Sequence, residues 1–208
     1  MKRNLLIATL AALSLGVLVS GAQAASIVDE WASVKQPAAP TLKPVTVDTK
    51  TTALLMLDFM KQNCGKRPRC VASLPAMKKL LNEARAAKVA VVYSIIANST
   101  PADVLLEVAP LASEPHVLSG PDKFLHTDLE KVLKDKGIKT VITVGTSSNG
   151  AVFFTASGAA FRGMKVIVPV DGMTSADPIS EYATVLDFQT APGVSAKTTL
   201  TRSDMIKF

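Results

Sequence analysis

Short apolar segments alternate with amphipathic segments along most of this chain, and this alternation restricts the fold more than any other feature. The segments at 52–59 and 89–96 are continuous apolar runs, as expected of strands that are buried on both faces of a sheet. Between them, residues 73–88 carry apolar side chains at helical spacing. A strand, a helix and a second strand in this order indicate a βαβ unit with two parallel strands.

The same alternation continues towards the C-terminus. Amphipathic helices are predicted at 127–137, 148–162 and 177–190, and strands at 139–145 and 164–173. We therefore predict an α/β fold, namely a three-layer α/β/α, Rossmann-like domain with a mostly parallel sheet of about six strands. The sequence lacks the G-x-G-x-x-G and G-x-x-x-x-G-K-[ST] patterns of nucleotide-binding loops, so no cofactor is predicted.

The first 24 residues have the pattern of a secretory signal peptide. Lys2 and Arg3 precede an apolar run that ends in the small residues AQA, so we expect cleavage after Ala24. The run is too short to favour a transmembrane helix, and no membrane attachment is expected after cleavage; an uncleaved N-terminal anchor is the alternative. The mature protein is therefore predicted to be periplasmic or secreted.

The remaining chain is predicted to consist of an arm and one domain. Residues 25–50 carry three prolines without a sustained period, which is typical of an extended N-terminal arm. Residues 51–208 are long enough to bury a sizeable core as a single domain. Removal of residues 1–24, which hold two basic residues and no acidic one, lowers the formal net charge from +6 to +4. The lysines are scattered without interleaved aromatic residues, so nucleic-acid binding is not predicted, and a homo-oligomer stays open.

Both cysteines lie in the segment NCGKRPRC, residues 63–70. In an oxidising compartment, this close spacing favours a structural disulfide between Cys64 and Cys70 that closes a tight loop. A redox pair and a metal site are the competing interpretations. The spacing is not C-x-x-C, and the only histidines are His116 and His126.

Polar residues follow three of the predicted strands. Ligands of open parallel sheets bind beyond the carboxyl ends of the strands. Asp58 ends the first apolar strand, a turn at 145–151 ends a central one, and Asp171 follows the next. An aspartate that follows five apolar residues is partly desolvated, which suits proton transfer. Capping of backbone amides is the alternative for Asp58 and the preferred interpretation for Asp171.

Three segments resemble the isochorismatase-like hydrolases, also called the cysteine hydrolase superfamily. ALLMLDF (53–59) is similar to the first strand of the family with its terminal aspartate. KFLHTDLEKVLKDKGIKTVITVGT (123–146) resembles the F-x-x-T-x-L helix that leads into the central strand. GTSSNGAVFFTASGAAFRGMKVIVPVDGMTS (145–175) resembles the G-x-x-T-x-x-C-V-x-x-T-A stretch and the strand after it. The resemblance covers about 53–175 and implies the same α/β/α fold.

The resemblance also implies roles for individual residues. In the family, an aspartate activates a nucleophilic cysteine and a lysine assists. Asp58 keeps the acid/base position, but the cysteine position is occupied by Ala151. Lys123 is the candidate for the lysine, although it directly precedes Phe124, whereas the lysine of the family usually stands several residues earlier. Metal-binding members carry an Asp/His cluster after the first strand; this sequence has MKQNCGKRPRC there, so no metal is predicted.

The turn at 145–151 is the predicted substrate and oxyanion site. By resemblance, a cis peptide falls near Thr146–Ser147, and the backbone N–H groups of Ser147 and Ala151 form an oxyanion hole. Asn149 and Gly150 complete this site. Independently of the family, a helix that begins at 148–151 presents free N–H groups and a positive dipole end to an anion.

Two functions follow from these residues. The first is an exported hydrolase that acts on a small polar or carboxylate-bearing molecule, with Asp58 as general acid/base and without a cysteine nucleophile. Isochorismatases proper, which hydrolyse a vinyl ether without a cysteine, are the precedent that the resemblance supplies. The alternative is a catalytically inactive protein that binds a small molecule on the same fold. Ser147 or Ser148 as a replacement nucleophile is disfavoured, because no histidine is near in sequence.

Overall fold

The computed structural model describes residues 26–208. The predicted signal peptide and its cleavage site lie outside the described residues. The chain divides into two compact units, one up to Ala38 and one from Ala39 to Phe208. The described part of the first unit holds a short helix, α1 (Ile27–Glu30), and a 3-10 turn at Trp31–Ser33. All further strands and helices belong to the second unit.

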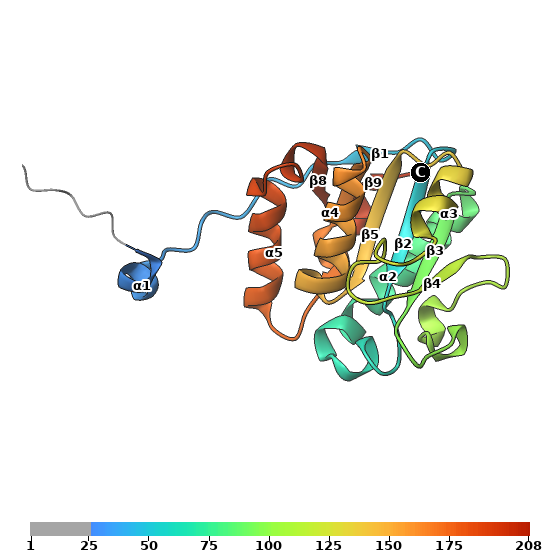
Figure 1. Ribbon diagram of the computed structural model, residues 1–208, viewed down its shortest axis with the longest axis horizontal. Helices are drawn as coiled ribbons and strands as arrows, with labels where there is room; N and C mark the ends of the chain where they lie inside the picture. Colours follow the sequence, from blue (N-terminus) through green and yellow to red (C-terminus); the bar gives the residue numbers. More distant parts are fainter. Residues whose placement is uncertain (1–25) are drawn as a thin grey trace, which may run out of the picture. The chain divides into compact units, whose positions relative to one another are not determined.

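A parallel sheet forms the middle layer of the second unit (Figure 1). Its strands lie in the order β4-β3-β2-β5-β6-β8, and the short β7 pairs with β5; all of these pairings are parallel. The strands are β2 (Thr52–Leu57), β3 (Ala90–Ile95), β4 (His116–Leu118), β5 (Thr140–Thr146), β6 (Lys165–Pro169), β7 (Met173–Thr174) and β8 (Thr198–Thr201). The predicted fold is confirmed, and β7 is the strand beyond the six expected.

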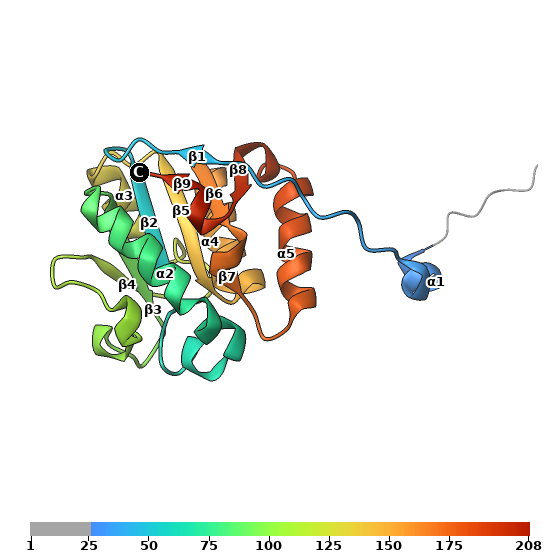
Figure 2. The ribbon, with the colours of Figure 1, turned by 180° about the vertical axis from the view of Figure 1, so that it is seen from behind.

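Helices cover both faces of this sheet. Three of them lie on one face, namely α3 (Leu129–Asp135), α4 (Phe153–Phe161) and α5 (Pro178–Thr190), as Figure 1 shows. The other face is covered by α2 (Pro68–Ala86), which lies in front of the strands when the molecule is seen from behind (Figure 2). The result is the three-layer α/β/α arrangement.

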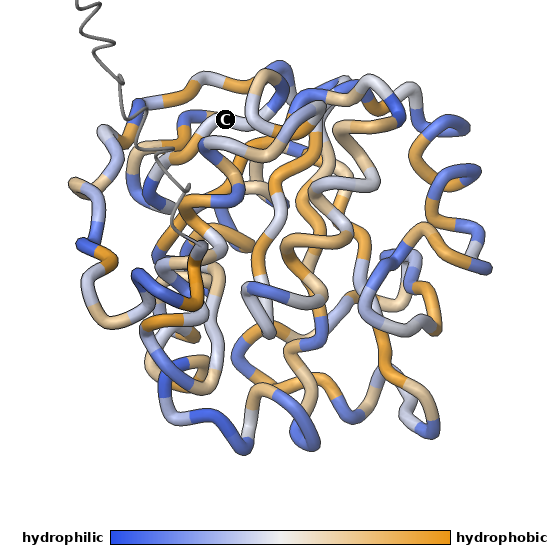
Figure 3. The backbone as a smooth tube through the Cα atoms, turned by 60° about the vertical axis from the view of Figure 1, so that its left-hand side comes forward, coloured by the Kyte–Doolittle hydropathy of each residue, from blue (hydrophilic) through white to orange (hydrophobic). Residues whose placement is uncertain are grey.

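The strands are buried on both faces, as their apolar runs predict. Along β2, Ala53, Leu55 and Leu57 pack with the helices α3, α4 and α5, whereas Leu54 and Met56 pack with α2. Successive side chains of a strand point to opposite faces, so a strand between two helical layers needs apolar residues throughout. Figure 3 shows this as hydrophobic colour along the central strands, with hydrophilic residues at the loops.

The end of the predicted arm is part of the second unit. The strand β1 (Val45–Thr46) pairs in parallel with β9 (Ile206–Lys207) near the C-terminus. The N–H group of Lys43 donates to the carbonyl of Leu200 at 3.0 Å. In the part of the chain that the structure describes, no helix is both long enough and apolar enough to cross a membrane.

The helix α2 begins five residues before the start predicted from its apolar stripe. It starts at Pro68, which suits the first position of a helix because its missing N–H group needs no partner there. The first turn lacks the apolar spacing that marks the rest of the helix, and Pro75 in the next turn resembles a helix breaker in sequence. The helix therefore extends past a residue that the sequence pattern treats as a boundary.

A disulfide joins Cys64 to Cys70, as predicted from their spacing. Cys64 lies in a 3-10 turn (Cys64–Lys66), Cys70 lies in the first turn of α2, and both side chains are fully buried. The bond closes a short loop, which lowers the conformational entropy of the unfolded chain.

The purified protein should therefore show no titratable thiol in denaturant until a reductant is added. The variant Cys64→Ala/Cys70→Ala should lose about 2 kcal/mol of unfolding free energy, from the entropy of a loop of this length. Urea unfolding with and without dithiothreitol measures the difference, and the reductant should not affect the variant. Two free thiols in the unreduced, denatured wild type would contradict the disulfide.

Candidate active site

Asp58 lies at the carboxyl edge of the sheet, directly after β2. The residue is only 4% exposed, and its backbone adopts a left-handed conformation with φ of 55°. Ser94, at the end of the neighbouring strand β3, donates its hydroxyl to Oδ1 of Asp58 at 2.6 Å. The backbone N–H of Asp58 in turn donates to Oγ of Ser94 at 3.1 Å. Two mutual hydrogen bonds thus fix the orientation of the carboxyl group.

Lys123 contacts the second oxygen of the same carboxyl group. Its Nζ donates to Oδ2 of Asp58 at 2.7 Å and to the carbonyl of Gly120 at 2.7 Å. The side chain of Lys123 is fully buried. Burial lowers the pKa of Lys123, although the carboxylate of Asp58 acts in the opposite direction. The structure thus brings together the two residues that the sequence nominates for acid/base chemistry.

The turn that carries the remaining candidates lies next to Asp58. Leu57 and Gly145 are partners in the parallel register of β2 and β5, so Asp58 lies beside Thr146. The peptide bond Thr146–Ser147 is cis, as the resemblance implies. Close packing of the two strands requires glycine at position 145, because a Cβ there would overlap the carbonyl of Leu57.

The turn continues into α4 through one π-helical turn, Ser148–Val152. Ala151 lies in this turn, is 3% exposed, and packs in the same core cluster as Leu57 and Phe124, the neighbours of Asp58 and Lys123 in sequence. By the resemblance, the methyl group of Ala151 occupies the position of the family's nucleophilic thiol. The sequence has two cysteines, and both are in the disulfide, so no thiolate is available.

The other predicted substrate-binding residues shape the turn. The carbonyl of Ser147 accepts the N–H groups of Gly150 at 3.1 Å and Val152 at 3.2 Å. A side chain on Gly150 would meet the hydroxyl of Ser147 at 2.6 Å, so glycine lets that hydroxyl lie against the turn. Oδ1 of Asn149 accepts a hydrogen bond from Ser175 at 3.3 Å. Asn149 therefore contributes to the support of the turn.

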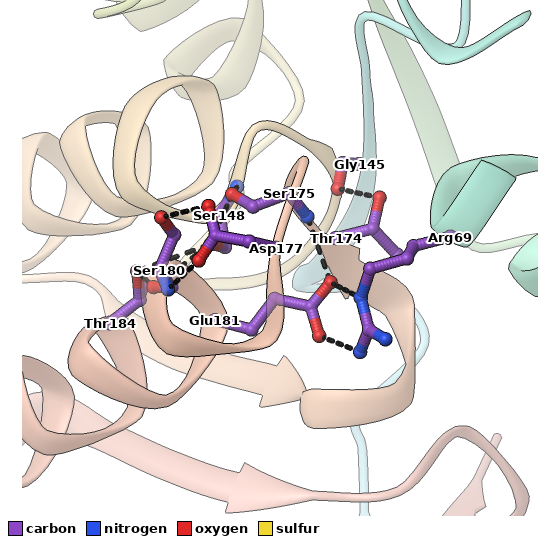
Figure 4. Close-up of polar contacts among 9 residues, drawn as sticks. All are labelled: Arg69, Gly145, Ser148, Thr174, Ser175, Asp177, Ser180, Glu181 and Thr184. Carbon is purple, nitrogen blue, oxygen red and sulfur yellow. Dashed lines mark hydrogen bonds and ion pairs between the residues drawn. The ribbon is translucent and has the colours of Figure 1, made fainter. Parts of the chain in front are cut away.

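A polar network behind the turn was not predicted from the sequence (Figure 4). Oγ of Ser148 lies 2.7 Å from Oγ of Ser175 and accepts a bond from Thr184 at 3.3 Å. Glu181 accepts the N–H of Ser175 at 2.9 Å and forms a two-bonded ion pair with Arg69. The network connects the turn to α5 and to the start of α2. No local pattern identifies these residues, because they come from four separate segments.

Arg67 also lies near the turn and was not among the residues predicted from the sequence. It is the residue directly before α2, it is half-buried, and its Nη1 donates to Oγ1 of Thr146 at 2.8 Å. The sequence contains one signal that points here: residues 59–82 hold no acidic residue but several basic ones, directly after Asp58.

Asp171, the third acidic candidate at this edge, has the capping role that was preferred for it. Its carboxylate accepts the backbone N–H of Ser203 at 2.8 Å and the hydroxyl of Ser203 at 2.6 Å. Within residues 26–208, no group of three or more His, Cys, Asp and Glu side chains could hold a metal ion. The site thus offers an aspartate–lysine pair next to the turn at 145–151 as its chemistry.

Removal of Lys123 tests how much the buried ion pair contributes to folding. The variant Lys123→Met should lose about 3–5 kcal/mol of unfolding free energy, because a buried carboxylate is left without its partner. The variant Asp58→Asn/Lys123→Met should regain most of that loss. Urea unfolding of the wild type, both single variants and the double variant measures the coupling; equal stability of Lys123→Met and the double variant would contradict it.

The same pair predicts a pH dependence of stability. Because burial lowers the pKa of Lys123 from its ordinary value of 10.5, the unfolded chain binds more protons at this residue just below pH 10.5 than the folded chain does. The unfolding free energy of the wild type, measured relative to Lys123→Met, should therefore rise with pH in that window. A difference that falls with pH would show that the lysine holds its proton more tightly in the folded protein.

Comparisons with known proteins agree with this fold. A family model described as the isochorismatase domain matches residues 52–196. An isochorismatase-like hydrolase from Alkaliphilus metalliredigens is 24% identical with a TM-score of 0.66, over 74% of this chain and 95% of that chain. The N-carbamoylsarcosine amidase of Thermoplasma acidophilum is 22% identical with a TM-score of 0.63, over 74% and 97%.

The nicotinamidase of Staphylococcus aureus has the same fold, with 17% identity and a TM-score of 0.64 over 73% of this chain and 99% of that chain. A comparison with curated protein sequences found no significant match. The family model covers well over half of the chain. This protein therefore belongs to the isochorismatase family.

Proposed function

We propose that this protein is an exported hydrolase that acts on a small polar or carboxylate-bearing molecule through Asp58, without a cysteine nucleophile. The observation that carries the proposal is the buried pair of Asp58 and Lys123 beside the turn that holds Ala151. Asp58 and Ala151 are 4% and 3% exposed, which suits a small substrate. Neighbouring structures named as a nicotinamidase and an N-carbamoylsarcosine amidase support a hydrolase.

Asp58 is the proton-transfer group in this proposal. For a vinyl ether, Asp58 gives a proton to the double bond, and water adds to the carbon that becomes electron-poor. The proton of that water returns to Asp58, and the resulting hemiketal breaks into an alcohol and a carbonyl compound. General acid/base catalysis of this kind needs a carboxyl group that is held within reach and shielded from bulk water.

Lys123 supplies the proton that Asp58 gives away. The ion pair and the neutral pair of carboxylic acid and amine have the same total charge, so a proton can shift along the 2.7 Å bond without moving net charge in or out of the buried site. Burial lowers the pKa of Lys123, which makes the ammonium a better proton donor to Asp58. Ser94 holds the other carboxyl oxygen during this exchange.

A binding protein without turnover is the second candidate function. The observation that favours it is Ala151, since the family position that would form a covalent intermediate carries only a methyl group. In that case small carboxylates and amides bind but are not converted, and changes at Asp58 alter affinity alone.

Export is part of the proposal and has two supports. The signal-peptide pattern of the first 24 residues predicts it. The disulfide between Cys64 and Cys70 is compatible with it, because such bonds persist in oxidising compartments. Detection of the precursor and of a shorter form that begins at Ala25 in separate cell fractions would test it.

Asp58→Asn should abolish turnover, because it keeps the shape of the side chain but removes the transferable proton. We expect a loss of about 100-fold or more in kcat/KM on the best substrate from a panel of small vinyl ethers and primary amides. Asp171→Asn is the matched control, as Asp171 caps Ser203 at the same edge of the sheet. Binding without turnover in the wild type would establish the second candidate instead.

Ala151→Cys should introduce a thiol that reacts with iodoacetamide, and it should add or raise amidase activity that the reagent blocks. The reason is that the pair of Asp58 and Lys123 lies next to the turn that carries residue 151. Iodoacetamide should leave any wild-type activity unchanged. Wild-type amidase activity that iodoacetamide blocks would contradict the assignment of both cysteines to the disulfide.

A further inference from the structure

The segment that follows β2 places several positive charges near the site. Residues 59–82 contain no acidic residue, whereas Lys61, Lys66, Arg67 and Arg69 lie close together in sequence. Such an excess of one charge attracts ligands of the opposite charge. The four cations differ in what they contact, and this difference identifies the one that is free to act on a ligand.

Three of the four cations are unsuited to that role. Arg69 is bound by the carboxylate of Glu181, and Lys61 donates to the carbonyl of Ala102 at 3.2 Å. Lys66 is exposed at the surface of the loop. Arg67 is half-buried, and its guanidinium contacts Thr146 at the end of β5.

The charge of Arg67 has no acidic partner among residues 26–208, since none of the ion pairs there includes it. Its bond to Thr146 is to a neutral hydroxyl and uses one of the five N–H groups of a guanidinium. The remaining donors form a planar fork whose geometry matches a carboxylate. An ammonium such as that of Lys66 offers no such fork.

Arg67 and Lys123 approach the edge of the sheet from opposite faces. Thr146 is two positions after Val144, which packs with Met77 of α2, so by strand alternation its side chain lies on the α2 side. Lys123 lies on the side of α3 and α4, where its neighbour Phe124 packs. The ammonium group of Lys123 is already paired with the carboxylate of Asp58. A substrate anion beside Asp58 therefore has Arg67 as its available cation.

The loop that carries Arg67 is held in one conformation. The disulfide between Cys64 and Cys70 closes the loop around Arg67, and Pro68 directly after it fixes the start of α2. A charged group that is held in place before the ligand arrives loses less conformational entropy on binding.

We propose that Arg67 is a specificity-determining residue that binds the carboxylate of the substrate while Asp58 acts on the scissile group. The proposal rests on the proposed function, because it names the substrate class of the same site: small molecules that carry a carboxylate. The disulfide loop has the role of a rigid support for the guanidinium. No covalent step is involved.

The test compares matched ligands on matched variants. Isothermal titration calorimetry measures binding of C3–C7 monocarboxylates and of their primary amides to the full mature chain. The variants are Arg67→Gln, Arg67→Lys and the control Lys66→Gln, which removes the same charge from the neighbouring position. The same pairs of compounds, as vinyl ethers with and without a carboxylate, are used for turnover.

We expect the wild type to bind at least one carboxylate more tightly than its amide. Arg67→Gln should weaken carboxylate binding about 10-fold or more, as for the loss of a hydrogen-bonded charge. Amide binding, which also reports that the variant is folded, should stay within about twofold. Lys66→Gln should behave as the wild type and Arg67→Lys should lie between, because lysine keeps the charge without the fork.

Two results would overturn the proposal. One is a wild type that binds no carboxylate in preference to its amide, and the other is an equal loss in Arg67→Gln and Lys66→Gln. Turnover separates this proposal from the proposed function. Hydrolysis that does not depend on Arg67 supports the proposed hydrolase function and contradicts the specificity role. Arg67-dependent binding without hydrolysis supports the role of Arg67 in binding and contradicts the hydrolase function.

Discussion

The site depends on one buried ion pair, that between Asp58 and Lys123. The two residues are 65 positions apart and come together only when β2 has its place in the sheet and the segment before α3 is folded against α4. Each charge makes the burial of the other possible, since an isolated buried charge is strongly unfavourable. Two further hydrogen bonds give each charged group a second partner: Ser94 donates to Asp58, and Lys123 donates to the carbonyl of Gly120.

The arrangement of the turn follows from the same edge of the sheet. Gly145 lets β5 approach Leu57, and this contact brings Thr146 beside Asp58. The polar network of Ser148 and Ser175 then holds the turn from behind. Hydrogen bonds of this kind fix position more than they add stability, because each replaces a bond to water. The proposed proton transfer needs such fixed positions.

Structural features that depend on a few neighbouring residues can be predicted from the sequence. The apolar run of β2 and the apolar stripe of α2 are visible because burial on both faces and burial on one face each leave a pattern within a few residues. Asp58 was found because it follows such a run, and Lys123 was named by resemblance to the family. The contact of Arg67 was missed because its partner Thr146 is 79 positions away, so no local pattern connects the two residues.

The methyl group of Ala151 limits the chemistry that this part of the site can perform. A thiolate in this position would itself attack a substrate and would keep part of it bound until water arrived. In the proposed hydrolysis, water is the nucleophile instead, and it exchanges its protons with Asp58. The pair with Lys123 suits that demand, because it can hold one proton in either of two places without a change in net charge. In the proposed mechanism, the carboxyl group of Asp58 therefore takes part in every proton transfer.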